Sequence, residues 1–135
     1  MADEKRNEDK YMQLQMLQQQ VEQITEYMEK LQMQQKELDT SIEALTELQK
    51  IDLNTELLAP VANGIFLKAE LKDNQKLVVN VGADVSTEKT IPEVITLLEE
   101  QKEKITENIV EAENVLQELY RHGHKLYQES GEVVN

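Results

Sequence analysis

The heptad spacing of apolar residues constrains this chain more than any other feature. In the first third of the sequence, apolar residues follow one another at intervals of three, four or seven: Leu14, Leu17, Val21, Ile24, Met28, Leu31, Leu38, Ile42 and Leu45. A second series with the same period comprises Ile91, Ile95, Leu98, Ile105, Ile109, Ala112, Leu116, Leu119 and Leu126. This period gathers the apolar side chains into one stripe along a helix and is typical of coiled coils. It predicts two long helices, over residues 11–52 and 91–128.

The two helices are expected to pair antiparallel, each covering the apolar stripe of the other. A register in which facing residue numbers sum to 140 places Leu14 against Leu126. The polar exceptions then face apolar residues, with Gln35 against Ile105 and Lys102 against Leu38, and their long side chains are expected to reach water past the stripe. Gly123 faces Leu17, which predicts weak packing there.

The ends of the predicted helices are marked to different degrees. Thr90 and Glu93 form a capping box that fixes the start of the second helix, and Pro92 is tolerated in its first turn. The charged segment 1–10 and the last segment, 129–135, are expected to be frayed, and the whole chain, 1–135, is expected to be one domain.

Between the helices, residues 56–90 are expected to form four short β-strands, over 56–61, 65–71, 76–81 and 85–90. Asn63-Gly64 and Asp73-Asn74 can supply the positive φ angles of tight turns, and Gly82-Ala83-Asp84 marks another bend. Two hairpins of this size cannot bury their own apolar side chains, and their edges attract further strands. The segment is therefore expected to assemble with other subunits, through Leu58, Val61, Ile65, Phe66, Leu67, Leu77, Val78, Val79, Val81 and Val85.

Composition narrows the class of function. The net charge of −13 divides into −6 over residues 1–55, −1 over 56–90 and −6 over 91–135. Because binding to phosphate backbones depends on Lys and Arg, this distribution disfavours a nucleic-acid partner. The chain has no cysteine, no apolar signal segment and no run long enough to cross a membrane, so we expect a cytoplasmic protein without a membrane partner.

A family resemblance rests on two stretches of the strand region. The first, residues 56–73, reads Glu-Leu-Leu-Ala-Pro-Val-Ala-Asn-Gly-Ile-Phe-Leu-Lys-Ala-Glu-Leu-Lys-Asp, and the second, residues 79–90, reads Val-Asn-Val-Gly-Ala-Asp-Val-Ser-Thr-Glu-Lys-Thr. Both resemble the β-region of an alpha-class prefoldin subunit of the archaeal type. Their most specific parts are Leu58-Ala59-Pro60-Val61, the Val81-Gly82 turn and Glu88-Lys89-Thr90.

The resemblance implies an α+β fold: a long antiparallel coiled-coil hairpin of helices with two β-hairpins at its bend, which form an intersubunit β-barrel. It implies a hexamer of two alpha-class and four beta-class subunits. It also implies a co-chaperone that needs no ATP or cofactor, binds non-native proteins at the helix tips, and passes them to a group II chaperonin. The same β-region would equally serve a structural adaptor that assembles in a larger scaffold without holding clients.

If clients bind at the tips, apolar groups there must be accessible. Met12 and Met16 lie one helical turn apart and outside the stripe, and flexible thioethers adapt to varied apolar partners. Ordinary packing is the competing interpretation, because Met is a good helix former and Tyr often covers the flank of a stripe. The candidate client-binding residues are Tyr11, Met12, Leu14, Met16, Leu17, Tyr120, Leu126 and Tyr127.

Catalytic and metal sites have little support in the sequence. His122 and His124 supply two possible ligands without an ordered carboxylate, so solvated histidines are the better interpretation. The glutamates on the predicted helices are expected on exposed faces, without the burial that acid–base catalysis needs. We therefore expect no enzyme, no metal and no cofactor.

Overall fold

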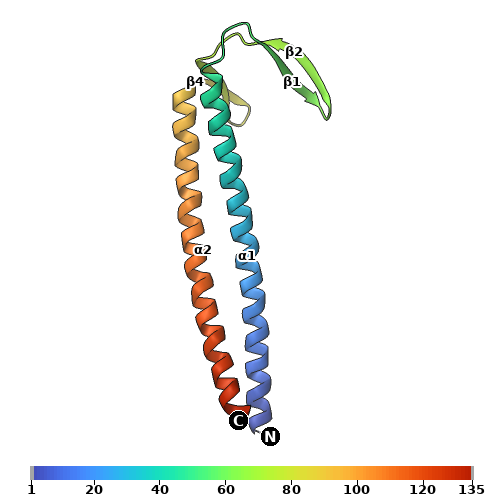
Figure 1. Ribbon diagram of the computed structural model, residues 1–135, viewed down its shortest axis with the longest axis vertical. Helices are drawn as coiled ribbons and strands as arrows, with labels where there is room; N and C mark the ends of the chain where they lie inside the picture. The colour runs from blue at the N-terminus through green and yellow to red at the C-terminus, as the bar shows by residue number, and fades with distance from the viewer. Residues whose placement is uncertain (1, 135) are drawn as a thin grey trace. The chain divides into compact units, whose positions relative to one another are not determined.

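The computed structural model describes residues 2–134, with the backbone alone for residues 129–134. The order of elements is α1 (Ala2–Leu48), β1 (Glu56–Ala62), β2 (Ile65–Glu70), β3 (Lys76–Gly82), β4 (Val85–Thr90) and α2 (Ile91–Val134). Two long helices with two antiparallel β-hairpins between them confirm the predicted fold class (Figure 1). The chain divides into a helical unit, residues 2–35 with 104–134, and a hairpin unit, residues 36–103.

The predicted apolar stripe matches the pattern of burial in both units. From Leu14 to Leu45, the residues at heptad positions are buried or half-buried, and the residues between them are exposed. The same holds in α2 apart from Val94, which is half-buried between two heptad positions, and Gly123 and Lys102 take their places in the series as half-buried residues. Since no other spacing selects these positions, the heptad interpretation of both helices is confirmed.

Specific contacts agree with the antiparallel register. In the helical unit, Gly123 lies against Leu17, a pair whose residue numbers sum to 140 as predicted. The Gln35 Nε2 donates a hydrogen bond to the Thr106 Oγ1 at 2.9 Å. In the hairpin unit, Lys102 forms an ion pair with Asp39. The last two pairs sum to 141, so the polar residues of the stripe bond to polar groups one position beyond their predicted neighbours. They gain partners in the protein as well as access to water.

The ends of the helices differ from the prediction. α1 already includes residues 2–10, which are mostly good helix formers, and α2 continues to Val134. Met1 and Asn135, the outermost residues of the segments expected to be frayed, lie outside the described residues. α1 ends at Leu48 instead of residue 52. The chain forms a tighter turn there, in which the Lys50 amide donates a hydrogen bond to the Glu47 carbonyl and the Ile51 amide donates one to the Leu48 carbonyl.

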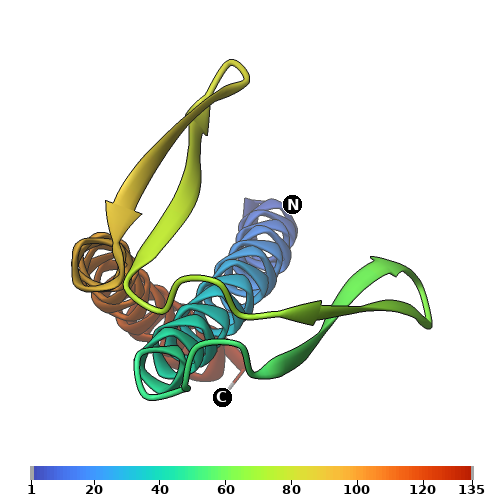
Figure 2. The same cartoon turned by 90° about the horizontal axis from the view of Figure 1, so that it is seen from above.

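The two hairpins have the same register, offset by twenty residues. β1 pairs with β2 from Glu56 opposite Glu70 onward, and β3 pairs with β4 from Lys76 opposite Thr90 onward. The register of each shifts by one residue before the loop, after Pro60 in one hairpin and after Asn80 in the other. They extend in different directions from their bases (Figure 2) and form two separate two-stranded sheets among the described residues.

The prediction that Asp73-Asn74 supplies the positive φ angles of a tight turn is wrong. Gly64 has the positive φ expected of the first turn, and Gly82, Ala83 and Asp84 have positive φ in the second, but Asp73 and Asn74 do not. The Asp73 carboxylate instead accepts the backbone N–H groups of Gln75 (2.8 Å) and Lys76 (3.0 Å) at the start of β3. These two hydrogen bonds stabilise the ionised form and lower the pKa of Asp73 from its ordinary value of 3.8.

The base of each hairpin supplies the core of the hairpin unit. Ile91 is fully buried, with no exposed surface, and Leu71 is nearly so. The amide of each donates to the strand opposite, Leu71 to Thr55 and Ile91 to Gln75. The Thr90 hydroxyl accepts the Glu93 amide at 3.3 Å, which confirms this half of the predicted capping box.

Candidate functional site

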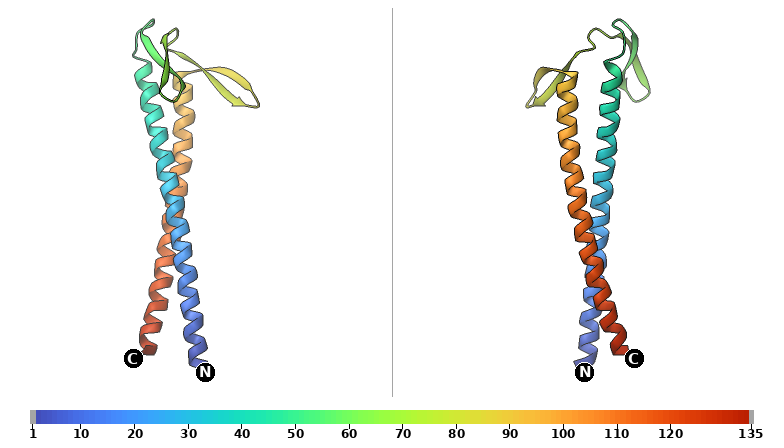
Figure 3. Two further views of the ribbon diagram at one scale, coloured as in Figure 1. Left: turned by 90° about the vertical axis from the view of Figure 1, so that its right-hand side faces the viewer. Right: turned by 60° about the vertical axis from the view of Figure 1, so that its left-hand side comes forward.

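The helical unit contains an open apolar groove between α1 and α2. Its volume is about 520 Å³. The residues that line it lie near the N-terminus of α1 and the C-terminus of α2, and Figure 3 shows these two helix ends. We call it the interhelix groove. It is lined by Leu14, Leu17, Gln18, Val21, Leu119, Tyr120, Gly123, His124 and Tyr127.

Gly123 forms a close contact in this groove and does not loosen it. A Cβ atom at this position would lie only 2.8 Å from the Leu17 Cδ2. Leu17 is accordingly 8% exposed, although a glycine stands opposite it. The expectation of weak packing at this pair was therefore wrong, because the missing side chain is what allows Leu17 to approach α2.

The structure divides the predicted client-binding residues into three groups. Four of them line the groove together: Leu14, Leu17, Tyr120 and Tyr127. Leu126 is buried in the stripe, so it supports the helix pair and presents little surface. The remaining three, outside the groove lining, are exposed on α1: Tyr11, Met12 and Met16.

Sequence reasoning missed part of the groove. Val21 and Leu119 were assigned to the stripe, and His124 was treated as a solvated residue. His124 does lie on the surface, where its Nε2 is 3.3 Å from the Gln128 Nε2, but its ring also borders the groove. The predicted register could have identified Val21 and Leu119 as groove residues. Their numbers sum to 140, so they form the pair that follows Leu17–Gly123 in the stripe.

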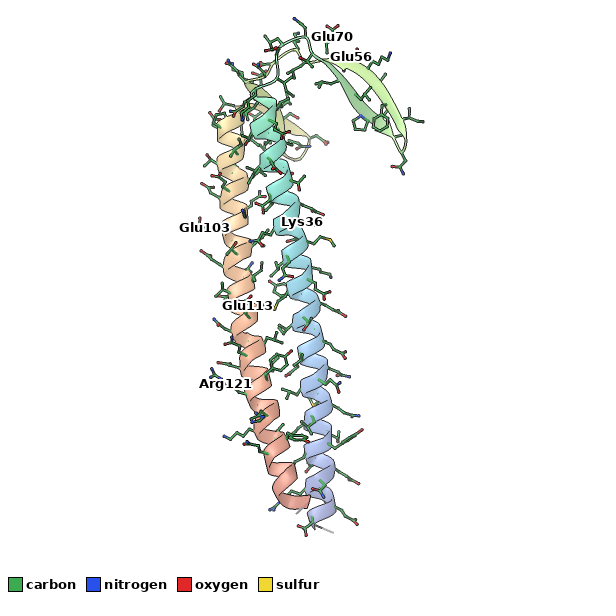
Figure 4. The ribbon with its side chains drawn as sticks, viewed as in Figure 1. Lys36, Glu56, Glu70, Glu103, Glu113 and Arg121 are labelled. Carbon is green, nitrogen blue, oxygen red and sulfur yellow. The ribbon has the colours of Figure 1, made fainter. Side chains whose placement is uncertain are left out.

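The hairpins expose the residues expected to assemble with other subunits. Most of the ten predicted residues are more than half exposed, and Leu77 and Val79 are half-buried on one face of their hairpin. Charged residues lie close to this surface. Figure 4 shows Glu56 and Glu70 at the same end of the first hairpin, where they stand opposite each other in the register.

Little in the described structure points to chemistry. A second cavity, of about 440 Å³, lies at the base of the hairpins and is lined by Gln49, Asn74, Gln75, Thr90 and Pro92, without an ionisable group. Among residues 2–134, no group of three or more His, Asp or Glu side chains could hold a metal ion. None of the described helices is long and apolar enough to cross a membrane.

These features define a class of protein: an assembly subunit whose β-hairpins leave apolar side chains uncovered, and whose paired helices carry an apolar groove. Comparison with known proteins gives this class a family. Residues 17–135 match the family model described as Prefoldin subunit. The chain therefore belongs to the prefoldin family.

Individual relatives agree with the alpha-class resemblance. Prefoldin subunit alpha of Archaeoglobus fulgidus is 27% identical over 96% of this chain and 94% of its own length. Prefoldin subunit alpha of Pyrococcus horikoshii is 31% identical over 88% of this chain and 81% of its own length. A chain from the cryo-EM structure of filamentous PFD from Methanocaldococcus jannaschii shares the fold, with a TM-score of 0.78 at 22% identity, over 88% of this chain and 98% of that one.

Proposed function

We propose that this chain is a subunit of an ATP-independent, non-enzymatic co-chaperone of the cytoplasm. The complex would bind non-native proteins, prevent their aggregation and deliver them to a group II chaperonin. Family membership supports the role, and the observation that carries it is the interhelix groove. The groove has an apolar floor and lies open to solvent, and the exposed Tyr120 and Tyr127 border it. Such a surface offers apolar contact to an unfolded chain without enclosing it.

The mechanism that we propose depends on several weak sites acting together. In a hexamer of two alpha-class and four beta-class subunits, each pair of helices would contribute one apolar contact, and Met12 and Met16 would widen the contact on α1. Linked weak contacts raise the overall affinity, and they allow a client to leave one contact at a time. This is the property that transfer to a chaperonin requires.

A structural adaptor remains the second candidate, since exposed hairpins would serve assembly in either role. The two candidates differ at the groove. A co-chaperone must use the groove surface, whereas an adaptor needs only the hairpins. Substitutions in the groove that leave assembly intact therefore separate them.

The test is suppression of the thermal aggregation of citrate synthase, measured by light scattering without ATP. The chain is assayed alone and with a beta-class prefoldin subunit, and the mass of the complex is determined in parallel. We expect suppression with the hexamer-sized complex. The double variant Tyr120→Ser/Tyr127→Ser should lose most of it. The matched control Tyr27→Ser removes a tyrosine that is 46% exposed and lies outside the groove. This control should keep the suppression of aggregation. A complete hexamer without suppression would favour the adaptor.

A further inference from the structure

The two segments that form the interhelix groove differ in charge from the rest of the chain. In α1, residues 11–21 include no charged side chain, and in α2, residues 119–128 include Arg121 and Lys125 but no acidic residue. Every residue that lines the groove belongs to one of these two segments. Together they carry a charge of +2 in a chain whose net charge is −13. The groove therefore lies in a non-acidic part of a strongly acidic chain.

A second hollow adjoins the groove on α2. Its volume is about 340 Å³, and it is lined by Gln117, Tyr120, Arg121 and His124. Tyr120 and His124 also line the groove, so the two hollows share a border. Arg121 lies on the side of α2 that faces away from α1 (Figure 4). A segment that leaves the groove across Tyr120 and His124 therefore meets the Arg121 guanidinium on the outer flank of α2.

The side chain of Arg121 is available to bind a ligand. It is exposed, and it forms no ion pair or hydrogen bond with another side chain of the described chain. Its planar group of N–H donors matches the geometry of a carboxylate. Lys125 is exposed one helical turn further along α2 and adds a second positive charge to this part of the surface.

Screening by salt decides which charges a bound segment meets. At physiological ionic strength the Debye length is about 8 Å, so acidic residues several helical turns away from the groove are largely screened. The nearest acidic residues along the two helices flank the groove segments, and none of them lines either hollow: Asp9, Glu22, Glu118 and Glu129. Arg121 is therefore the charged group in direct reach of a segment that fills both hollows.

We propose that the interhelix groove selects segments of unfolded proteins in which an apolar side chain is followed within a few residues by Asp or Glu. The apolar side chain occupies the groove, and the carboxylate binds Arg121 in the adjoining hollow. The net charge of the chain alone would favour the opposite choice, a cationic segment. The inference rests on the proposed co-chaperone function, and it names the class of segment that this chain binds.

A dye attached beside the groove tests the proposal within the assembled complex. The natural chain has no cysteine, so Gln15→Cys can be labelled with acrylodan, an uncharged dye whose emission depends on its surroundings. Gln15 is exposed and does not line the groove, and the dye reports on this chain without a signal from the beta-class subunits. Three short peptides share the same Leu and Phe residues and carry Glu, Gln or Lys at all other positions. A fourth peptide keeps the Glu residues and has Ser in place of Leu and Phe.

The four peptides are titrated at physiological ionic strength. We expect the Glu peptide to bind about fivefold more tightly than the Lys peptide, the effect of an exposed ion pair at the upper end of its usual range. The Gln peptide should lie between them, and the Ser peptide should bind much more weakly than the Glu peptide. A Lys peptide that binds equally or more tightly would overturn the proposal. So would a Ser peptide that binds as tightly as the Glu peptide, because the site would then be a simple anion site.

Two double variants separate the local charges from the net charge. Arg121→Gln/Lys125→Gln should abolish the preference for the Glu peptide and leave binding of the Gln peptide unchanged. Lys30→Gln/Lys104→Gln is the matched control, since it removes the same charge from exposed residues outside both hollows and should keep the preference. Helical content, measured by circular dichroism, should be equal in the two variants. An equal loss of preference in both would show that net charge, and not Arg121, sets the selectivity, and would overturn the proposal.

Failure of this inference can be told apart from failure of the proposed function. The natural complex is assayed in parallel for hexamer mass and for suppression of citrate synthase aggregation. If it suppresses aggregation and binds all three apolar peptides equally, only the selectivity is wrong. If no peptide changes the dye emission although the complex suppresses aggregation, clients bind outside the groove, and its selectivity is ruled out as well. If a complete hexamer does not suppress aggregation, the co-chaperone role is wrong, whatever the peptides do.

Discussion

At the scale of single residues, Gly123 shows how an absent side chain shapes a surface. Leu17 fills the space that a Cβ would occupy, and the groove has this contact in its lining. We predict that Gly123→Val destabilises the helix pair by about 1–2 kcal/mol, because overpacking outweighs the gain in helix propensity. Urea unfolding followed by circular dichroism measures the change.

The contact itself is tested by combining two variants. Leu17→Ala should destabilise the chain alone, since it removes a buried side chain. In the double variant with Gly123→Val, the loss should be smaller than the sum of the two single losses, because each substitution relieves the other. Additive losses would mean that Leu17 and residue 123 do not pack together.

Asp73 gives the hairpin unit a dependence on pH. Its carboxylate is stabilised in the folded chain by the amides of Gln75 and Lys76, so its folded pKa lies below the unfolded one. Its contribution to stability is therefore complete above about pH 3.8 and is lost as the pH falls through the lowered folded pKa. We predict that Asp73→Ala lowers the free energy of unfolding at pH 7 and that the difference narrows in acid. Asp73→Asn keeps an acceptor and should lose less. A difference that stays constant down to pH 2 would contradict this.

At the scale of elements, each hairpin leaves apolar side chains uncovered, and we propose that partner subunits cover them. Val79 is half-buried beside Leu77 on one face of its hairpin, and a carboxylate there would remain charged in any interface that covers it. We predict that Val79→Asp abolishes assembly with a beta-class subunit while helical content stays near that of the natural chain. Lys72→Asp also introduces an acidic group in the hairpin unit, but outside the strands, and should assemble normally. Analytical ultracentrifugation and circular dichroism report the two properties. Normal assembly of the Val79 variant would place the interface elsewhere.

How well each element could be predicted depends on the range of the forces that shape it. The heptads and the Thr90 cap are local patterns, and they identified both helices and the start of α2. The end of α1 was misplaced because a distant residue contributes to it: the Asn74 Nδ2 donates to the Ile51 carbonyl at 2.9 Å. The packing at Gly123 was mispredicted for a related reason, since it depends on the contact with Leu17 of the other helix.

At the scale of the whole molecule, the two tasks that we propose, assembly and client binding, use different residues of the chain. Apolar strand residues must be covered for assembly, whereas apolar groove residues must stay accessible to bind a client. The groove belongs to the helical unit and the strands to the hairpin unit. In the proposed co-chaperone, the residues that bind a client would therefore differ from those that join the subunits.

This separation predicts the outcome of trimming the helices. Removing residues 1–17 together with 123–135 deletes much of the groove and leaves the hairpins, so the complex should keep its mass and lose most suppression of aggregation. The control removes one heptad from each helix, residues 29–35 and 105–111, which face each other and preserve the phase of the stripe on both sides. It shortens the helices, but keeps the groove, and should still hold clients. If the trimmed chain holds clients as well as the control does, the binding surface lies outside the groove.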